Sequence, residues 1–194
     1  THSRKDTLRD IIKDLPSLVK VLVVDFVDLE TDISVLPHAV MWRDALGQYA
    51  PAPISFTRVP FDHPLFIMYS SGTTGAPKCI VHGHGGTLLQ HLKEHRYHLD
   101  TGTGDRVFYF TTCGWMMWNW LVSALALETT IYLYDGAPTY PNVTALFDYV
   151  AEEQVTFFGT SAKFIDALKA ARARPGEAYD LSALRTMGST GSPL

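Results

Sequence analysis

The sequence has little cysteine, little charge and no long apolar run. It holds only two cysteines, Cys79 and Cys113, which excludes a small disulfide-stapled scaffold and indicates a reducing, cytoplasmic compartment. Charged residues make up 19% and the net charge is -4, so no basic stripe is available to neutralise a nucleic-acid backbone. The longest apolar runs, such as Val21–Val24 and Leu121–Leu127, are too short to span a membrane. We therefore expect no nucleic-acid partner and no membrane span.

Apolar bursts alternate with helical patterns along the chain. Hydrophobic residues make up 46%, a normal proportion for a globular protein. Runs such as Leu65–Tyr69 and Val107–Thr111 are rich in β-branched and aromatic residues and predict strands. Apolar residues in 143–150 recur at i, i+3, i+4 and i+7, which predicts a helix. This alternation predicts an α/β fold, with a mixed or parallel sheet layered with helices.

Local signals also predict element boundaries. Thr87-Leu88-Leu89-Gln90 has the capping-box pattern, so we expect a helix to begin there and run to about Tyr97. A second helix is expected from Ser161, and Pro175-Gly176 should end it. Residues 19–27 predict a buried strand, and residues 184–187 a short strand that leads into a loop from Gly188.

The segment Ser70–Lys78 is a loop rich in glycine and hydroxyl groups. Its glycines, Gly72 and Gly75, permit backbone conformations and close approaches that a Cβ would forbid. Successive N–H groups can then form an anion-binding nest, and Lys78 adds a compact positive charge. Four hydroxyls provide further donors for phosphate and contacts for Mg²⁺; they belong to Ser70, Ser71, Thr73 and Thr74. The loop therefore predicts a triphosphate site.

The order of these residues identifies the kind of loop. Counted from Gly72, Pro77 and Cys79 stand where a Walker A loop requires Gly and Ser or Thr, which rules that loop out. The order instead resembles the signature loop of the adenylate-forming superfamily, with Cys79 in place of the final Gly of the superfamily's consensus. From Pro60 onward the chain is most similar to the acyl-CoA synthetases that act on acetoacetate, chiefly through Phe108–Trp120.

The resemblance implies an acid–thiol ligase reaction. A small carboxylic acid, with acetoacetate expected, attacks the α-phosphate of ATP to give an acyl-adenylate and pyrophosphate, and coenzyme A then displaces AMP. Ser70–Gly75 and Lys78 would hold the β- and γ-phosphates, with Lys78 as the catalytic residue. Gly191, Ser192 and Pro193 match a Gly-Glu-Pro stretch that lies along the adenosine, with Ser192 in place of the Glu.

The same resemblance predicts where the acid binds. Gly114-Trp115 matches a Gly-Trp pair at the edge of the acyl pocket, and Trp115, Met116, Met117 and Asn119 are the expected pocket residues. Met117 replaces a Thr of the acetyl-type enzymes, which suggests a different acid. Asn119 is a candidate hydrogen-bond donor to the keto oxygen of acetoacetate. The alternative that Trp115, Met116, Trp118 and Trp120 only pack in the core stays open, and for Trp118 and Trp120 it is the expectation.

The resemblance also sets expectations for domain organisation. Residues 1–194 are expected to form part of one N-terminal, AMP-binding domain. The superfamily's adenylation lysine belongs to a mobile C-terminal domain that we expect outside these residues. We therefore expect these 194 residues alone to be inactive. The sequence does not specify an oligomeric state.

Two alternatives from other functional classes remain. One is a nucleotide-binding module without catalysis. The other is a zinc hydrolase, because His91, Glu94 and His95 fit the H-x-x-E-H pattern on a predicted helix. A five-residue pattern with two wildcards is common by chance, so the simpler expectation is an exposed helix flank and no metal site.

Overall fold

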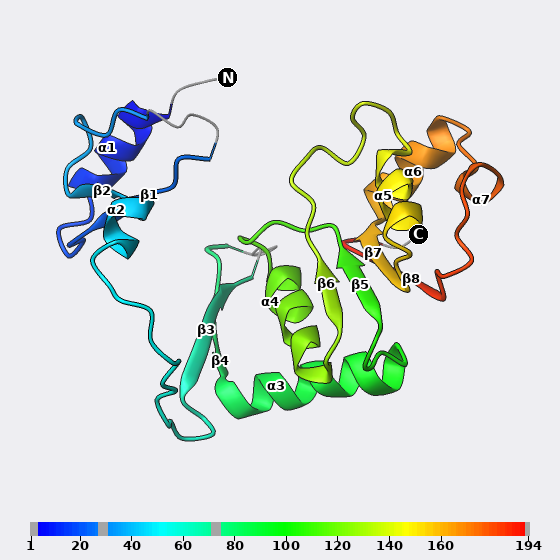
Figure 1. The fold of residues 1–194 in the computed structure, drawn as a ribbon, viewed down its shortest axis with the longest axis horizontal. Helices are drawn as coiled ribbons and strands as arrows, with labels where there is room; N and C mark the ends of the chain where they lie inside the picture. The colour runs from blue at the N-terminus through cyan, green and yellow to red at the C-terminus, as the bar shows by residue number, and fades with distance from the viewer. Residues whose placement is uncertain (1–3, 27–30, 71–74, 193–194) are drawn as a thin grey trace. The chain divides into compact units, whose positions relative to one another are not determined.

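The computed structural model describes residues 4–26, 31–70 and 75–192, and the chain divides into two compact units, residues 1–57 and 58–194 (Figure 1). Unit 1 contains α1 (Lys5–Lys13), β1 (Val21–Val23), β2 (Ala39–Met41) and α2 (Trp42–Leu46). β1 and β2 pair in parallel. The predicted strand 19–27 is shorter and less buried than expected, since the side chain of Val19 is 86% exposed and that of Val24 is 59% exposed.

Unit 2 begins with a hairpin and continues into a helix-covered sheet. In chain order its elements are β3 (Pro64–Tyr69), β4 (Cys79–Gly83), α3 (His84–Lys93), the π-helical turn η1 (Glu94–His98), β5 (Arg106–Tyr109), α4 (Met116–Ser123), the 3-10 helix η2 (Ala124–Leu127), β6 (Thr130–Tyr132), α5 (Ala145–Glu152), β7 (Phe157–Ser161), α6 (Ala162–Ala170), α7 (Pro175–Ala178) and β8 (Thr186–Thr190).

The sheet of unit 2 has four strands in the order β6-β5-β7-β8, and every neighbouring pair is parallel. Helices lie between successive strands in the chain, as parallel pairing requires (Figure 1). The predicted α/β fold is therefore confirmed.

Both faces of this sheet are covered. Phe108 and Phe158 face α5 and α6, where they pack with Phe147 and other apolar side chains. Alternation along the strands turns Val107 and Phe157 to the opposite face, where the side chains of α4 cover them. Burial on both faces explains why the apolar residues Val107–Tyr109 of β5 and Phe157–Phe158 of β7 are consecutive and do not alternate with polar ones.

β3 and β4 form an antiparallel hairpin, with Ile67 opposite Val81 and Met68 opposite Ile80. The predicted strand at 65–69 is confirmed. Unlike the sheet, the hairpin is exposed: the side chain of Ile67 is 59% exposed and that of Tyr69 is 70% exposed.

Three boundary predictions were wrong. α3 begins at His84, directly after β4, so Thr87 is a buried residue inside the helix and not its cap. α6 stops at Ala170, so Pro175 does not end it. Pro175 instead begins α7, since the N–H that proline lacks has no partner within the helix at the first helical position. Gly188 lies within β8 and not in a loop. The helix start at Ser161 is confirmed, since its Oγ accepts a hydrogen bond from the Phe164 N–H at 3.3 Å.

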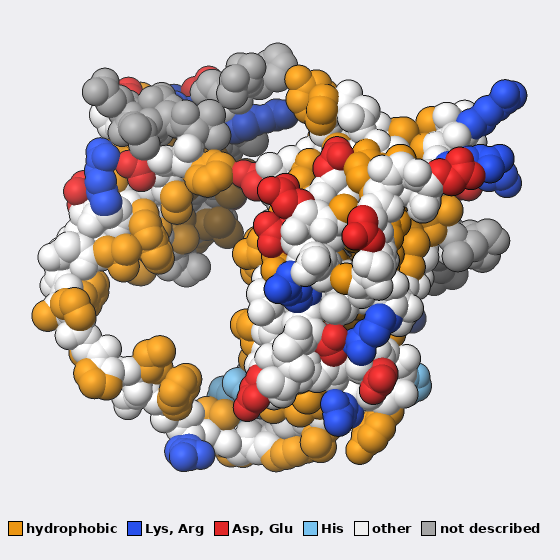
Figure 2. All heavy atoms as spheres, turned by 45° about the vertical axis from the view of Figure 1, so that its right-hand side comes forward, with side chains coloured by type: hydrophobic (Ala, Val, Ile, Leu, Met, Phe, Trp, Pro, Cys, Tyr) orange, Lys and Arg blue, Asp and Glu red, His pale blue; other side chains and the backbone are white. Residues whose placement is uncertain are grey.

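No helix among the described residues is long and apolar enough to cross a membrane. On the face drawn in Figure 2, basic and acidic side chains are intermixed and form no continuous basic stripe.

Candidate functional site

The glycine-rich loop joins the two strands of the hairpin. Its ends are held together because the Ser70 N–H donates to the Lys78 carbonyl at 3.0 Å and the Lys78 N–H donates to Ser70 Oγ at 3.2 Å. Gly75 has φ +140°, a conformation that side chains rarely adopt, and no described atom lies within 4 Å of where its Cβ would be. The Lys78 side chain is exposed. The predictions for Ser71, Gly72, Thr73, Thr74 and Pro193 fall outside the described residues.

A cavity of about 390 Å³ lies at the carboxyl ends of β5, β7 and β8, and we call it the carboxyl-end cavity. Its lining includes Trp115, Met117, Lys163, Gly191 and Ser192. The structure therefore brings two residues predicted for the acid pocket together with two predicted for the adenosine. Open α/β sheets place their ligands in this position, beyond the carboxyl ends of the strands.

Tyr109 organises this cavity, although the sequence analysis did not single it out. Its hydroxyl donates to the Thr160 carbonyl at 3.1 Å and lies 3.1 Å from Thr190 Oγ1, so one side chain links the ends of β5, β7 and β8. The ring crosses β7 at Gly159, where any Cβ would clash with it. The sequence signals were its place in the middle of the predicted strand Val107–Thr111 and within the stretch Phe108–Trp120 that carries the resemblance.

A second cavity, of about 350 Å³, lies between α4 and β8, and we call it the α4–β8 cavity. It is lined by Tyr109, Met117 and Thr190, which it shares with the carboxyl-end cavity, and by Trp120, Phe157 and Gly188 among others. A group bound at the strand ends could therefore extend along α4.

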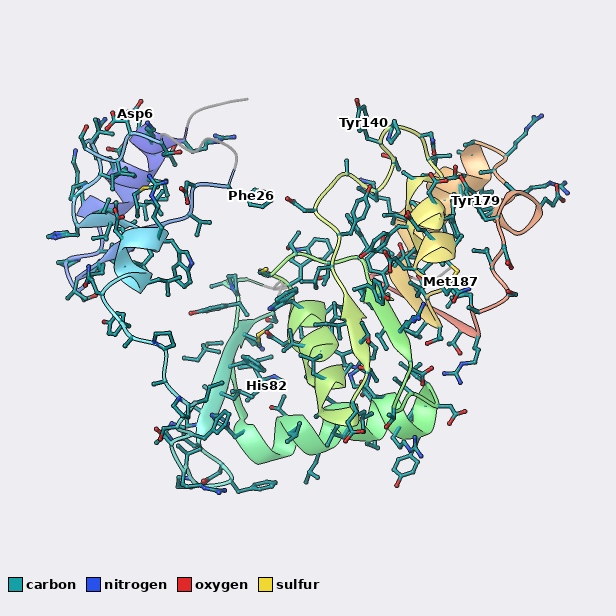
Figure 3. The ribbon with its side chains drawn as sticks, in the orientation of Figure 1. Asp6, Phe26, His82, Tyr140, Tyr179 and Met187 are labelled. Carbon is teal, nitrogen blue, oxygen red and sulfur yellow. The ribbon has the colours of Figure 1, made fainter. Side chains whose placement is uncertain are left out.

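The other two predicted pocket residues line a different space. Asn119 lies in a hairpin cavity of about 490 Å³ between the β3–β4 hairpin, α3 and α4, together with His82, which is labelled in Figure 3. Met116 lines this cavity and also the α4–β8 cavity. Asn119 Nδ2 donates to Met68 Sδ at 3.4 Å, and sulfur is a weak acceptor.

The model of the AMP-binding enzyme family matches residues 1–194. The chain belongs to this family. It is 59% identical over 155 residues to an acetoacetyl-coenzyme A synthetase of Rhizobium meliloti (strain 1021), covering 80% of this chain and 24% of that protein. It is 47% identical over 200 residues to an acetoacetyl-CoA synthetase of Danio rerio, covering 100% of this chain and 30% of that protein.

A solved acetoacetyl-CoA synthetase from Streptomyces lividans has the same fold over this stretch. The TM-score is 0.87 at 43% identity, over 99% of this chain and 29% of that one. Our chain thus spans less than a third of the length of these relatives.

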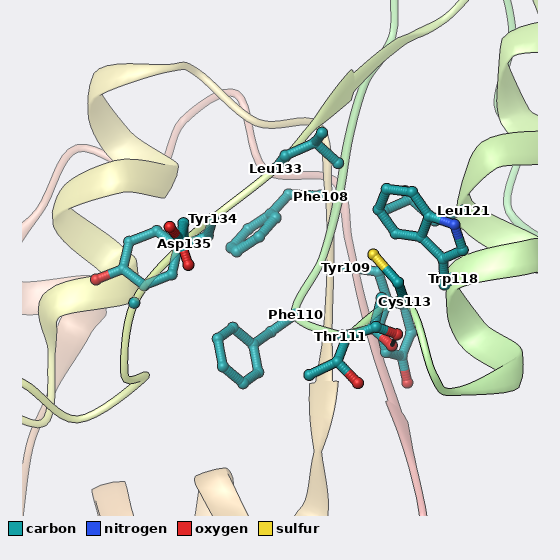
Figure 4. A pocket seen from close by; sticks show the side chains of 12 residues that line it. Phe108, Tyr109, Phe110, Thr111, Cys113, Trp118, Leu121, Leu133, Tyr134 and Asp135 are labelled. Carbon is teal, nitrogen blue, oxygen red and sulfur yellow. Dashed lines mark hydrogen bonds between the residues drawn. The ribbon is translucent and has the colours of Figure 1, made fainter. Parts of the chain in front are cut away.

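A further cavity, of about 410 Å³, lies beyond the ends of β5 and β6 (Figure 4). It is lined by aromatic rings, among them Phe110 and Tyr134, whose centroids are 6.2 Å apart, and by Cys113 and Asp135. Cys113 and Cys79 are both free and exposed.

The H-x-x-E-H segment is a structural element and not an exposed flank. His95 is fully buried, and its Nε2 lies 3.0 Å from the Trp120 carbonyl oxygen and 3.2 Å from Ser123 Oγ. Burial lowers the pKa of His95 and also that of His91. Across the described ranges, no group of three or more His, Cys, Asp or Glu side chains is placed to hold a metal ion. The zinc interpretation therefore gains no support.

Proposed function

We propose that this chain supplies the ATP- and acid-binding part of an AMP-forming acyl-CoA synthetase that acts on acetoacetate. Several relatives with 46–59% identity carry the name acetoacetyl-CoA synthetase. The observation that carries the proposal is the carboxyl-end cavity, where Trp115 and Met117 meet Gly191 and Ser192. The acid and the adenosine must bind side by side for adenylation, and this cavity offers both sets of contacts in one place.

Each group then has a role. The loop Ser70–Gly75 and Lys78 would hold the β- and γ-phosphates, and the exposed ammonium of Lys78 would balance the charge of the departing pyrophosphate. Gly191, Ser192 and Pro193 would lie along the adenosine. Trp115 and Met117 would orient the acid for attack on the α-phosphorus.

The chemistry needs positioning more than covalent participation by the protein. A carboxylate oxygen attacks the α-phosphorus and pyrophosphate leaves; the coenzyme A thiol then attacks the acyl carbonyl and AMP leaves. Mg²⁺ would neutralise phosphate charge. It would be held through the phosphates, as Mg²⁺ commonly is, with the loop hydroxyls of Ser70, Ser71, Thr73 and Thr74 as further contacts. The cavity would contribute by holding the carboxylate oxygen in line for attack on the α-phosphorus.

The same proposal extends to the rest of the enzyme. We take residues 1–194 to be part of one N-terminal domain, and the enzyme to be cytoplasmic, in keeping with its free cysteines. Because the chain spans less than a third of its relatives, we expect the isolated 194 residues to be inactive. ATP–pyrophosphate exchange by this polypeptide alone would contradict that expectation.

The test uses the full-length gene product that contains these residues. We expect acetoacetate-dependent ATP–pyrophosphate exchange, and acetoacetyl-CoA formation when coenzyme A is added. Acetate and butyrate serve as matched acids. No exchange with any of the three acids would overturn the proposal, and exchange favoured by acetate or butyrate would overturn acetoacetate as the acid.

Asn119 has a separate test. If it donates to the keto oxygen, Asn119→Ala should reduce the preference for acetoacetate over butyrate. An unchanged preference would rule this role out, and the position of Asn119 in the hairpin cavity, apart from Trp115, makes this test informative.

A further inference from the structure

Two consecutive residues of the π-helical turn η1 converge on one residue of α4. Glu94 bonds to the side chain of Trp120, and His95 bonds to its carbonyl group. The turn η1 continues α3 and ends the helix, and π-helical turns are rare. Here the turn directs two neighbouring side chains to the same target.

His95 completes the end of α4. Where α4 changes to the 3-10 helix η2, the Ala124 N–H donates to the Leu121 carbonyl, so the Trp120 carbonyl needs another partner. His95 Nε2–H donates to it at 3.0 Å, and Ser123 Oγ donates at 2.6 Å. The imidazole also lies against the indole of Trp120, with ring centroids 4.0 Å apart.

Glu94 fixes the indole ring itself. Its Oε2 accepts from Trp120 Nε1 at 3.1 Å, and its Oε1 accepts from Gln90 Nε2 at 2.7 Å. Both carboxylate oxygens therefore have protein donors. Glu94 itself lines the α4–β8 cavity and the hairpin cavity, but its two oxygens are bound to Trp120 and Gln90, which suits it to hold the indole and not to bind an anionic acid.

Trp120 is a wall of the α4–β8 cavity and of the hairpin cavity. Its ring packs against Tyr109 at 5.9 Å and Phe157 at 5.8 Å between centroids. Tyr109 links the strand ends at the carboxyl-end cavity, and Met117 lies in the first turn of the same helix as Trp120. A shift of Trp120 would therefore change the shape of the space beside Met117.

We propose that Glu94 and His95 are positioning residues for the acid, which fix Trp120 and thereby the width of the α4–β8 cavity. This proposal rests on the proposed function, because it takes the acid to extend from the strand ends along α4. Acids that fit the cavity are then selected by a wall that Glu94 and His95 hold in place.

The test measures ATP–pyrophosphate exchange by the full-length gene product with acetoacetate and with the longer acid hexanoate. Glu94→Ala should raise the KM for acetoacetate about tenfold and lower its preference over hexanoate, while the KM for ATP stays within about twofold. Glu94→Gln still accepts from Trp120 Nε1 and should stay within about threefold of the wild type. Glu152→Ala, an exposed change on α5, is the matched control and should leave both KM values unaltered.

Trp120→Phe removes the indole donor and keeps a ring, so it should reproduce the acetoacetate effect even if Glu94→Ala fails to fold. Adding Glu94→Ala to Trp120→Phe should then change the acetoacetate KM by less than about twofold, since the bond is already gone. A full additional loss would overturn the proposal, as would an acetoacetate KM for Glu94→Ala equal to that of Glu152→Ala. Loss in Glu94→Gln as large as in Glu94→Ala would also overturn it. No acid-dependent exchange by the wild type is a different result, which overturns the proposed function.

Discussion

The parallel sheet and the β3–β4 hairpin of unit 2 are both built from apolar strands, but only the sheet buries them. Phe108 and Phe158 are fully buried, whereas Ile67 and Tyr69 of the hairpin are 59% and 70% exposed. Helices cover both faces of the sheet, whereas most apolar side chains of the hairpin are exposed to solvent. The comparison indicates that the sheet provides stability, while the hairpin carries the loop proposed to bind phosphate.

The largest expected effect tests the sheet side of this comparison. Phe158 stacks on Phe108 at 5.4 Å and meets Phe147 edge-on at 5.5 Å, so Phe158→Ala should remove about 3–5 kcal/mol from the free energy of unfolding. Ile67→Ala in the hairpin should cost less than about 1 kcal/mol, because the side chain is already exposed. Urea unfolding of the two variants measures both. Similar losses would show that the hairpin is as well covered as the sheet, and the comparison would fail.

A second prediction concerns the loop that the hairpin presents. Lys78→Ala should reduce kcat for exchange about a hundredfold to a thousandfold, since in the proposed mechanism this charge stabilises the departing pyrophosphate. The melting temperature should not change, because the Lys78 side chain is exposed. Lys169→Ala, an exposed lysine on α6, is the control for the loss of one positive charge. Equal activity in the two variants would remove Lys78 from the proposed mechanism.

Whether a feature could be predicted from the sequence depended on how far apart along the chain its interacting residues lie. The strand at 65–69, the loop after it and the Ser161 cap were predicted because each is a local pattern. The proximity of Trp115 to Ser192 was implied by the resemblance, since nothing local relates residues so far apart.

The hydrogen bonds of Glu94 and His95 to Trp120 were not predicted, for the same reason. Their hydrogen bonds to Trp120 join residues 26 and 25 positions apart, and no helix or strand periodicity predicts such pairs. The start of α3 was misplaced because β4 runs directly into the helix, so the capping pattern at Thr87 had no helix end to cap.

A substitution at Gly188 tests how tightly β8 is packed where it borders the α4–β8 cavity. A Cβ there would lie 2.8 Å from Phe157 Cζ, and the ring is confined by Trp120. Gly188→Ala should therefore cost about 1–3 kcal/mol in unfolding free energy and raise the KM for the acid. Gly176→Ala in α7, where no described atom lies within 4 Å of the added Cβ, should stay within about 0.5 kcal/mol of the wild type. Unfolding midpoints and exchange kinetics of both variants provide the measurement, and a neutral Gly188→Ala would mean that Phe157 can move aside.

The smallest expected effect is a dependence of stability on pH at His95, which lies between the two regions on η1. Burial lowers the pKa of His95, and its Nδ1 is buried with no hydrogen-bond partner among the described residues, so protonation is unfavourable in the folded state. The unfolded chain binds the proton more readily, and stability is therefore lost as the pH falls through the unfolded pKa of about 6.5. Between about pH 7.5 and 5.5 the wild type should lose about 1 kcal/mol more unfolding free energy than His95→Gln, whose amide can still donate to the Trp120 carbonyl but does not titrate. His91, whose pKa is also lowered by burial, remains in both proteins, and its positive charge also lowers the pKa of His95. Parallel pH profiles for the two proteins would show that His95 is protonated as easily in the folded state as in the unfolded one.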